Sequence, residues 1–116
     1  MYNLTQLIGR LTTEPEITKT ETGKKVCNIT LAVQRNFKNS NGIYEADFIR
    51  CVLWDGIASK VCEYCHKGDL VTVCGQLRTS NYMSNDQKKQ KIELVVEKLL
   101  FLSTKKDNTL AEISDK

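Results

Sequence analysis

The alternation of apolar and polar residues along the chain predicts five β-strands. Apolar residues run through 4–11, alternate with polar residues over 27–33 and 44–54, and return over 70–78 and 91–102. A period of two is typical of strands that bury one face. Gly9, inside the first segment, indicates a bulge or bend. Turn-forming residues such as those at 39–42 separate the segments, so we expect five strands at these positions.

Between residues 57 and 66 the apolar period changes to about 3.6, the period of a helix. Ile57, Val61 and Cys65 recur at every fourth position, which predicts a short amphipathic helix ended by Gly68. Three strands, a helix and two strands are the element order of the five-stranded Greek-key barrel called the OB-fold. The pattern therefore predicts an all-β fold with one short helix, although another small barrel or an open sheet fits the same order.

One predicted strand, residues 46–54, carries two large rings and a guanidinium on a single face. Because side chains alternate across a strand, Phe48, Arg50 and Trp54 share that face. The opposite face carries apolar residues that we expect to point inward: Ile49, Cys51 and Leu53. Rings flanking a cation suit stacking of unpaired bases. Aromatic residues also favour strands for packing reasons alone, so half-buried sheet residues are the alternative.

The charge distribution favours a polyanionic partner. The chain has 17 basic and 14 acidic residues, and through Lys106 it has 16 basic against 11 acidic ones. Basic residues also stand next to aromatic ones, with Arg35 and Lys38 around Phe37. A solvated surface explains the same counts. Rings enter an intact duplex only by unstacking it, so we expect the ligand to be unpaired nucleic acid.

Catalytic and membrane-spanning motifs are absent from the sequence. There is no P-loop, G-x-S-x-G or H-E-x-x-H motif, and the single histidine, His66, has no evident carboxylate partner. We therefore predict that the protein is not an enzyme. No apolar run approaches the ~20 residues that span a bilayer, and the N-terminus lacks the features of a secretion signal. These observations predict a cytoplasmic protein with no membrane partner.

The cysteine pattern offers a weaker, alternative function. Five cysteines, an odd number in a chain without an export signal, favour reduced thiols. Cys62 and Cys65 precede His66 in a C-x-x-C-H pattern, which is typical of haem attachment and suggests metal or redox chemistry. Haem attachment normally needs export, and structural zinc needs four ligands where only one histidine is present. We expect no metal and no cofactor. Three further cysteines are expected to be small core residues: Cys27, Cys51 and Cys74.

Five segments, in this order, resemble the bacterial-type single-stranded DNA-binding proteins. They are Leu7-Ile-Gly-Arg-Leu-Thr, Ile29-Thr-Leu-Ala-Val, Glu45-Ala-Asp-Phe-Ile-Arg-Cys-Val-Leu-Trp, Tyr64-Cys-His-Lys-Gly-Asp-Leu-Val and Gly75-Gln-Leu-Arg-Thr-Ser-Asn-Tyr. The resemblance implies a homotetramer of OB-folds around which single-stranded DNA wraps. It also implies a role in protecting that DNA during replication, recombination, repair or DNA uptake.

The resemblance implies a set of DNA-binding residues. The family's base-stacking positions fall on Phe37, Phe48, Trp54 and Tyr82. Its basic positions fall on Arg50 and Arg78. Further phosphate contacts are expected at Arg10, Arg35, Lys38 and Lys67. Three of them, Phe48, Arg50 and Trp54, are the residues that the strand pattern places on one face.

The resemblance also bears on the organisation of the chain. We expect residues 1–103 to form the DNA-binding domain and residues 104–116 to form a short flexible polar tail. Replicative members of the family end in an acidic tip with a Pro-Phe pair, which Leu110-Ala-Glu-Ile-Ser-Asp-Lys116 lacks. The chain thus resembles a short form from DNA uptake, phages or mobile elements, in which tail-mediated recruitment of other proteins is in doubt. A longer member of the family that had been truncated before its acidic tip would end in the same way. An RNA-binding or primosome-like OB module uses the same rings and stays open as the alternative.

Overall fold

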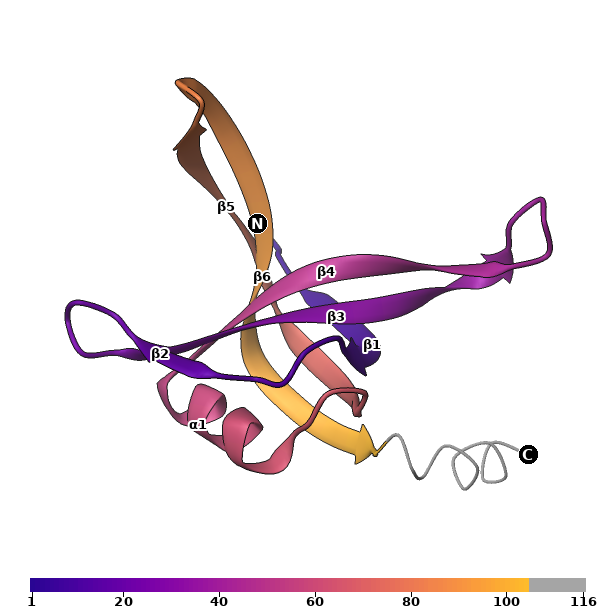
Figure 1. Cartoon of the computed structure of the whole chain (residues 1–116), viewed down its shortest axis with the longest axis horizontal. Coiled ribbons are helices and arrows are strands. Elements are labelled where there is room, and N and C mark those ends of the chain that lie inside the picture. Colours follow the sequence, from indigo (N-terminus) through magenta and orange to yellow (C-terminus); the bar gives the residue numbers. More distant parts are fainter. Residues whose placement is uncertain (105–116) are drawn as a thin grey trace.

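Five long strands wrap into a closed barrel in the computed structural model, which describes residues 1–104 (Figure 1). The elements along the chain are β1 Thr5–Leu11, β2 Ile17–Lys19, β3 Lys25–Lys38, β4 Tyr44–Trp54, α1 Asp55–Tyr64, β5 Leu70–Ser84 and β6 Gln87–Ser103. The barrel closes in the order β1-β5-β6-β4-β3, with β3 paired back to β1. The β4–β6 pair is parallel and the other pairs are antiparallel. This is the predicted OB-fold.

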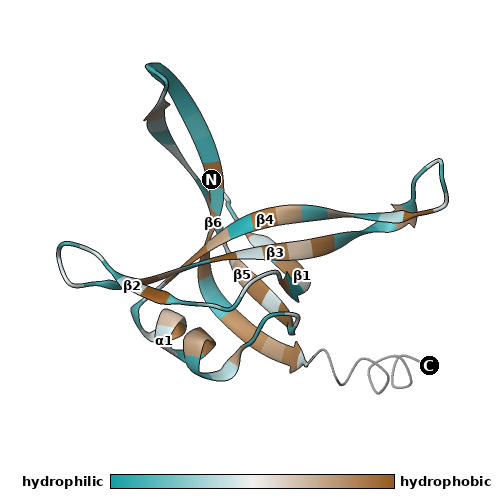
Figure 2. Ribbon diagram, in the orientation of Figure 1, coloured by the Kyte–Doolittle hydropathy of each residue, from teal (hydrophilic) through white to brown (hydrophobic). Residues whose placement is uncertain are grey.

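The alternation seen in the sequence fills the barrel interior. On β4, Cys51 and Leu53 are fully buried and Ile49 packs against the core, as predicted. The other strands and α1 contribute further buried apolar side chains: Leu11, Cys27, Ile29, Leu31, Ala58, Val61, Val71, Val73, Leu94 and Val96. Figure 2 shows the apolar residues of α1 beside the barrel. Full burial of one large apolar side chain contributes about 1.5–3 kcal/mol, so the inward faces are a major source of the stability of the fold.

Two glycines permit close contacts between strands. A Cβ at Gly9 would lie 2.7 Å from the carbonyl oxygen of Ala32 on β3. The register between β1 and β5 runs unbroken through Gly9, so this glycine serves a close approach, and the predicted bulge is absent from that pairing. At Gly75 the register with β6 shifts, and a Cβ would lie 1.9 Å from the Val95 carbonyl oxygen. Only glycine fits these two positions without displacing backbone.

The helix lies two residues earlier than the predicted range of 57–66. Asp55, with a left-handed φ of 48°, turns the chain directly from β4 into α1. Gly68 does not end the helix, contrary to the prediction. Its φ of 92° belongs to the turn that leads into β5, where its N–H donates a hydrogen bond of 2.8 Å to the Leu11 carbonyl.

Two hairpins, β3–β4 and β5–β6, project from the barrel further than the sequence predicts (Figure 1). Their outer portions are mostly exposed on both faces, so they carry no apolar alternation. The β5–β6 hairpin closes at Asn85 and Asp86, whose φ values of 52° and 62° are typical of a two-residue hairpin turn. The short strand β2 also escapes prediction, since three exposed residues show no period.

The barrel ends where the predicted domain ends, at Ser103. The tail predicted for residues 104–116 lies outside the described residues apart from Thr104, so the division of the chain stays a prediction. Within residues 1–104, no helix is long and apolar enough to cross a membrane.

The glycine at the β5–β6 register shift generates a stability prediction. Gly75→Ala forces a methyl group against the Val95 carbonyl, which we expect to lower the free energy of unfolding by about 1–3 kcal/mol, the usual cost of overpacking. Gly56→Ala is the matched control, because a Cβ at that helical position meets nothing within 4 Å. Alanine there is expected to stabilise the protein by up to about 1 kcal/mol. Urea unfolding measures both, and equal stability of the two variants contradicts the strand geometry.

Candidate nucleic-acid interface

A groove of about 540 Å³ lies between β4 and the β5–β6 hairpin. Phe48 and Arg50 line this hairpin groove from β4, and Tyr82 lines it from β5. The side chain of Phe48 is 67% exposed and that of Tyr82 is 43% exposed. Three of the residues predicted to bind DNA, from two strands distant in the sequence, therefore meet in one open groove.

The charges of the hairpin groove centre on Arg50. Within residues 1–104 its guanidinium makes no hydrogen bond or ion pair, so all its donors face solvent or a ligand. Arg50 also borders a neighbouring hollow of about 310 Å³ over the outer face of β3. Lys91 and Glu93 line both hollows and form an ion pair of 3.8 Å. Lys91 thus partly neutralises the Glu93 carboxylate in the groove. Arg50 adds a positive charge that no acid in the described residues pairs with.

Arg78 lies along the same hairpin, four residues before Tyr82 on β5. Its cross-strand neighbour on β6 is Glu93, and its Nη2 donates a hydrogen bond of 3.4 Å to the side-chain oxygen of Gln76. Alternation places Arg78 and Tyr82 on the same strand face. Of the two, Tyr82 lines the hairpin groove and Arg78 does not.

The other two predicted rings flank the hairpin groove and do not line it. Trp54 is 39% exposed and lies at the start of α1, about 20 Å along the strand from Phe48. Between them Val52 is buried where β4 pairs with β6. Phe37 is exposed on β3, in the stretch where the register with β4 shifts. The four rings therefore do not form one unbroken row.

Arg35 differs from Arg50 because its charge is taken up by carboxylates. Its Nη2 lies 2.8 Å from Asp47 Oδ1, and its Nη1 lies 3.2 Å from Glu45 Oε2. The hydrogen bond with Asp47 raises the pKa of Arg35, and the same bond lowers the pKa of Asp47. Exposed ion pairs add little stability. This network links β3 to β4 across the hairpin, and its two carboxylates offset the positive charge that Arg35 could offer a phosphate.

Arg10 and Lys67 lie near the C-terminal end of β1. The Nη1 atom of Arg10 donates a hydrogen bond of 2.9 Å to the Gly68 carbonyl. Arg10 pairs with Ala32 on β3, which in turn pairs with Phe48 on β4, so Arg10 lies two strands from that ring on the outer surface. Lys67 is exposed in the loop after α1. Arg10 thus adds positive charge to the outer surface that carries Phe48.

Tyr44 is an exposed ring that the sequence analysis did not select. It begins β4, four residues before Phe48, and alternation gives both rings the same face. The Nζ atom of Lys38 lies 5.6 Å from the centroid of the Tyr44 ring, within range of a cation–π contact. The period of two that identified Phe48 also reaches Tyr44.

His66 has a carboxylate partner, contrary to the prediction. Its Nδ1 lies 3.1 Å from Glu14 Oε1, although 52 residues separate the two in the chain. The same carboxylate accepts a hydrogen bond from the backbone N–H of Lys67. This bond, and then the one with His66, lower the pKa of Glu14. Both side chains are exposed, and the contact joins two loops.

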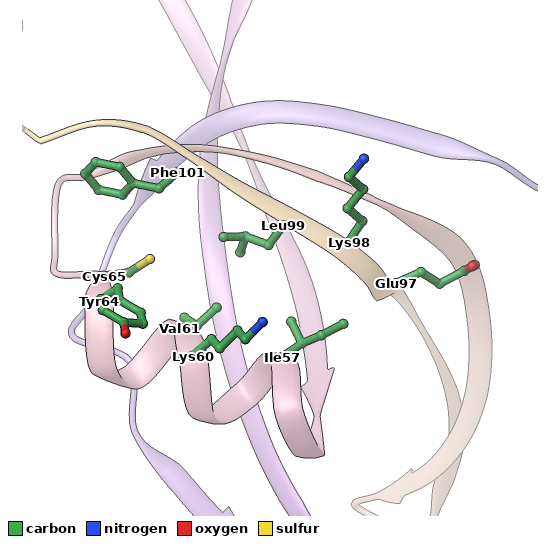
Figure 3. A pocket seen from close by; sticks show the side chains of 9 residues that line it. All are labelled: Ile57, Lys60, Val61, Tyr64, Cys65, Glu97, Lys98, Leu99 and Phe101. Carbon is green, nitrogen blue, oxygen red and sulfur yellow. The ribbon is translucent and has the colours of Figure 1, made fainter.

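A separate, apolar hollow of about 370 Å³ lies between α1 and β6 (Figure 3). Ile57, Val61 and Tyr64 line it from the helix, and Leu99 and Phe101 from the strand. Its polar lining residues are Lys60, Glu97 and Lys98. None of the residues proposed from the sequence to bind DNA lines this hollow.

The cysteines show no metal-binding arrangement. The Sγ atom of Cys62 lies 3.9 Å from that of Cys27, whereas Cys65 is buried in the core. In the described part of the chain, no group of three or more His, Cys, Asp or Glu side chains could hold a metal ion. Cys27 and Cys51 are core residues, as predicted, and Cys74 is half-buried. Burial raises the pKa of Cys27 and of Cys51 to about 12, so both thiols stay protonated at neutral pH.

A closed OB-fold barrel with exposed rings beside basic side chains defines an oligonucleotide-binding module. Residues 2–102 match the model of the Single-strand binding protein family, and the chain belongs to this family. The family resemblance of the sequence is thereby confirmed.

Similar proteins include several bacterial relatives. The chain is 44% identical over 108 residues to Single-stranded DNA-binding protein 3 of Listeria innocua, covering 92% of this chain and 68% of the relative. It is 41% identical over 112 residues to Single-stranded DNA-binding protein 2 of Streptococcus agalactiae, covering 97% and 86%. A solved complex of Plasmodium falciparum SSB with ssDNA has a TM-score of 0.78 and 32% identity, covering 89% of this chain and 96% of that one.

The buried thiols generate a prediction for alkaline pH. Burial raises the pKa of Cys51 from 9.0 to about 12, so the unfolded chain releases a proton that the folded protein keeps. The stabilisation is therefore complete below pH 9 and is lost as pH rises from 9 toward 12. Urea unfolding at several pH values should show a steeper loss for the wild type than for Cys51→Ala, by up to about 1.4 kcal/mol per pH unit. Parallel curves for the two proteins contradict the burial of this thiol.

Proposed function

We propose that this protein binds single-stranded DNA with little sequence preference and without catalysis. The observation that carries the proposal is the hairpin groove, where Phe48, Arg50 and Tyr82 converge. Membership of the Single-strand binding protein family supports it, as does the likeness to a complex with ssDNA. Bases stack on the rings, and the unpaired guanidinium of Arg50 meets the phosphates.

The remaining predicted residues extend the path of the strand. Phe37 and Trp54 offer rings on either side of the hairpin groove, and stacking on each contributes about 1–3 kcal/mol per base. Further positive charge comes from Arg10, Lys38, Lys67 and Arg78. Arg35 contributes less to this charge, because it forms ion pairs with Glu45 and Asp47. Because every base has a flat face, such a path tolerates any sequence.

The biological setting is part of the same proposal. The chain works in the cytoplasm as a homotetramer of OB-folds, each formed by residues 1–103, and protects single strands in replication, recombination, repair or DNA uptake. The family resemblance of the sequence supports these statements. Any recruitment of other proteins by the tail involves residues outside the described part of the chain.

The alternative ligand is RNA, as in an RNA-binding or primosome-like module. The rings of the hairpin groove stack on either nucleic acid, and only a contact to the 2′-hydroxyl distinguishes them. Competition between DNA and RNA oligomers of equal length separates the two functions. Preference for DNA supports the proposal, and preference for RNA replaces it with the alternative.

Removal of the groove rings tests the stacking. Phe48→Ala and Tyr82→Ala should each weaken binding of oligo(dT) by about 1–3 kcal/mol, since each removes a stacking surface. Trp54 is the only tryptophan and is partly exposed, so quenching of its fluorescence reports binding in both variants. Tyr64→Ala is the matched control, because Tyr64 is an exposed ring on α1 outside the hairpin groove. Unchanged affinity in both groove variants would falsify the proposed stacking.

Salt dependence tests the role of Arg50. Each phosphate contact releases counterions, so Arg50→Ala should reduce the slope of log K against log salt by about 0.7, the value per charge for single strands. Lys60→Ala, which removes a cation that lines the hollow beside α1 and not the groove, should leave the slope unchanged. Titrations with oligo(dT) between low and moderate salt measure both slopes. A wild-type slope in Arg50→Ala excludes a phosphate contact at this residue.

A further inference from the structure

A further hollow, of about 490 Å³, lies between β1 and the β3–β4 hairpin. Arg10 lines this β1 hollow from β1, and Gln34 and Asn36 line it from β3. Tyr44 and Ala46 line it from β4. It shares no lining residue with the hairpin groove, so it is a distinct feature of the outer surface.

The position of Tyr44 connects the two hollows. Tyr44, Ala46 and Phe48 alternate along the outer face of β4, and the two rings are 47% and 67% exposed. Four residues of strand separate the rings by about 13 Å. Nucleotides of one strand rise by about 3.4 Å when stacked, so a few of them span this distance. Ala46 between the rings is too small to cover either one.

The carboxamides in the β1 hollow are not used by the fold. Gln34 and Asn36 make no side-chain hydrogen bond within residues 1–104. Asn39, three residues further on, shows the contrast. Its carboxamide accepts hydrogen bonds from the N–H groups of Asn41 and Ile43 and thereby shapes the turn of the hairpin.

The chemistry of the β1 hollow matches a nucleotide. A carboxamide offers a donor and an acceptor side by side, the pattern that bonds to the edge of a base. The Tyr44 ring supplies a stacking face, and the Lys38 ammonium lies 5.6 Å from its centroid, where a flanking phosphate can meet it. Arg10 adds a second positive charge at the other side of the hollow.

We propose that the β1 hollow is a nucleotide subsite in which a base stacks on Tyr44. The carboxamides of Gln34 and Asn36 hydrogen-bond to the edge of that base. The proposal rests on the proposed binding of single-stranded DNA and extends it. One position along an otherwise sequence-tolerant path then distinguishes between bases.

The stacking is tested with ring variants of Tyr44. Tyr44→Ala should weaken binding of oligo(dT) roughly five- to a hundredfold, the loss that removal of one stacked base produces. Tyr44→Phe keeps the ring and should bind within about twofold of the wild type, since stacking does not need the hydroxyl. Tyr64→Ala serves as the control for removal of an exposed tyrosine elsewhere. Far-ultraviolet circular dichroism confirms that each variant is folded.

The base contact is tested with the double variant Gln34→Ala/Asn36→Ala. Kd values for oligo(dA), oligo(dC) and oligo(dT) of one length give the ratio of weakest to tightest binding. This ratio should shrink roughly two- to tenfold in the double variant, as expected for loss of one hydrogen bond to a base. Self-stacking of oligo(dA) affects both proteins equally and cancels from the comparison. An unchanged ratio overturns the base contact.

The outcomes separate this proposal from the one on which it rests. If Phe48→Ala weakens binding and Tyr44→Ala does not, the subsite is overturned while the binding of single-stranded DNA stands. If the folded wild type fails to bind any of the three oligomers at low salt, both proposals fall. Weakening by Tyr44→Ala together with retention in Tyr44→Phe supports the subsite.

Discussion

The pairing of β1 with both β5 and β3 is the constraint on which the rest of the structure depends. It closes the five-stranded barrel, in which only Arg10 and Leu11 of β1 pair with β3. Closure needs β1 to approach β3 at Gly9, where only a hydrogen atom fits in place of a side chain. Within the closed barrel, one face of each of its five strands is buried and the other makes no contact with the core.

Because the core occupies only the inner faces of the strands, the outer surface of the barrel can carry large aromatic rings exposed to water. Leu31, Leu53 and Leu94, buried inside, stabilise the barrel regardless of what the outer face contains. Phe48 and Tyr44 then contribute little to folding and remain available for a ligand. The two arginines on this outer surface also differ in their surroundings. Arg35 forms ion pairs with two carboxylates, whereas Arg50 is left without a partner among the described residues.

The sequence predicts those features that depend on local alternation. The bounds of β4 and the inward set of Ile49, Cys51 and Leu53 follow from a period of two, as does the outward direction of Phe48. Features without such a period were missed. The three exposed residues of β2 are one example, and the polar outer half of the β5–β6 hairpin is another.

Contacts between residues far apart in the chain also could not be predicted from the sequence. Glu14 meets His66 only because the loop after β1 and the loop after α1 come together in the closed barrel. Likewise, Phe48 and Tyr82 were each put forward from the sequence. That they line one groove depends on how β4 and the β5–β6 hairpin are placed in the closed barrel, which no local pattern encodes.

The two-residue turn of the β5–β6 hairpin has a consequence for how this arm can vary. Tyr82 and Lys89 are cross-strand neighbours near the tip, and Asn85 and Asp86 close it. Inserting one residue in each strand between the barrel and Tyr82 would rotate the ring to the other face, whereas inserting two would restore it. The reach of this arm is therefore adjustable in steps of two residue pairs, independently of the barrel. Related proteins can therefore differ in the length of this hairpin, and so in how much single-stranded DNA it contacts, while the barrel core stays the same.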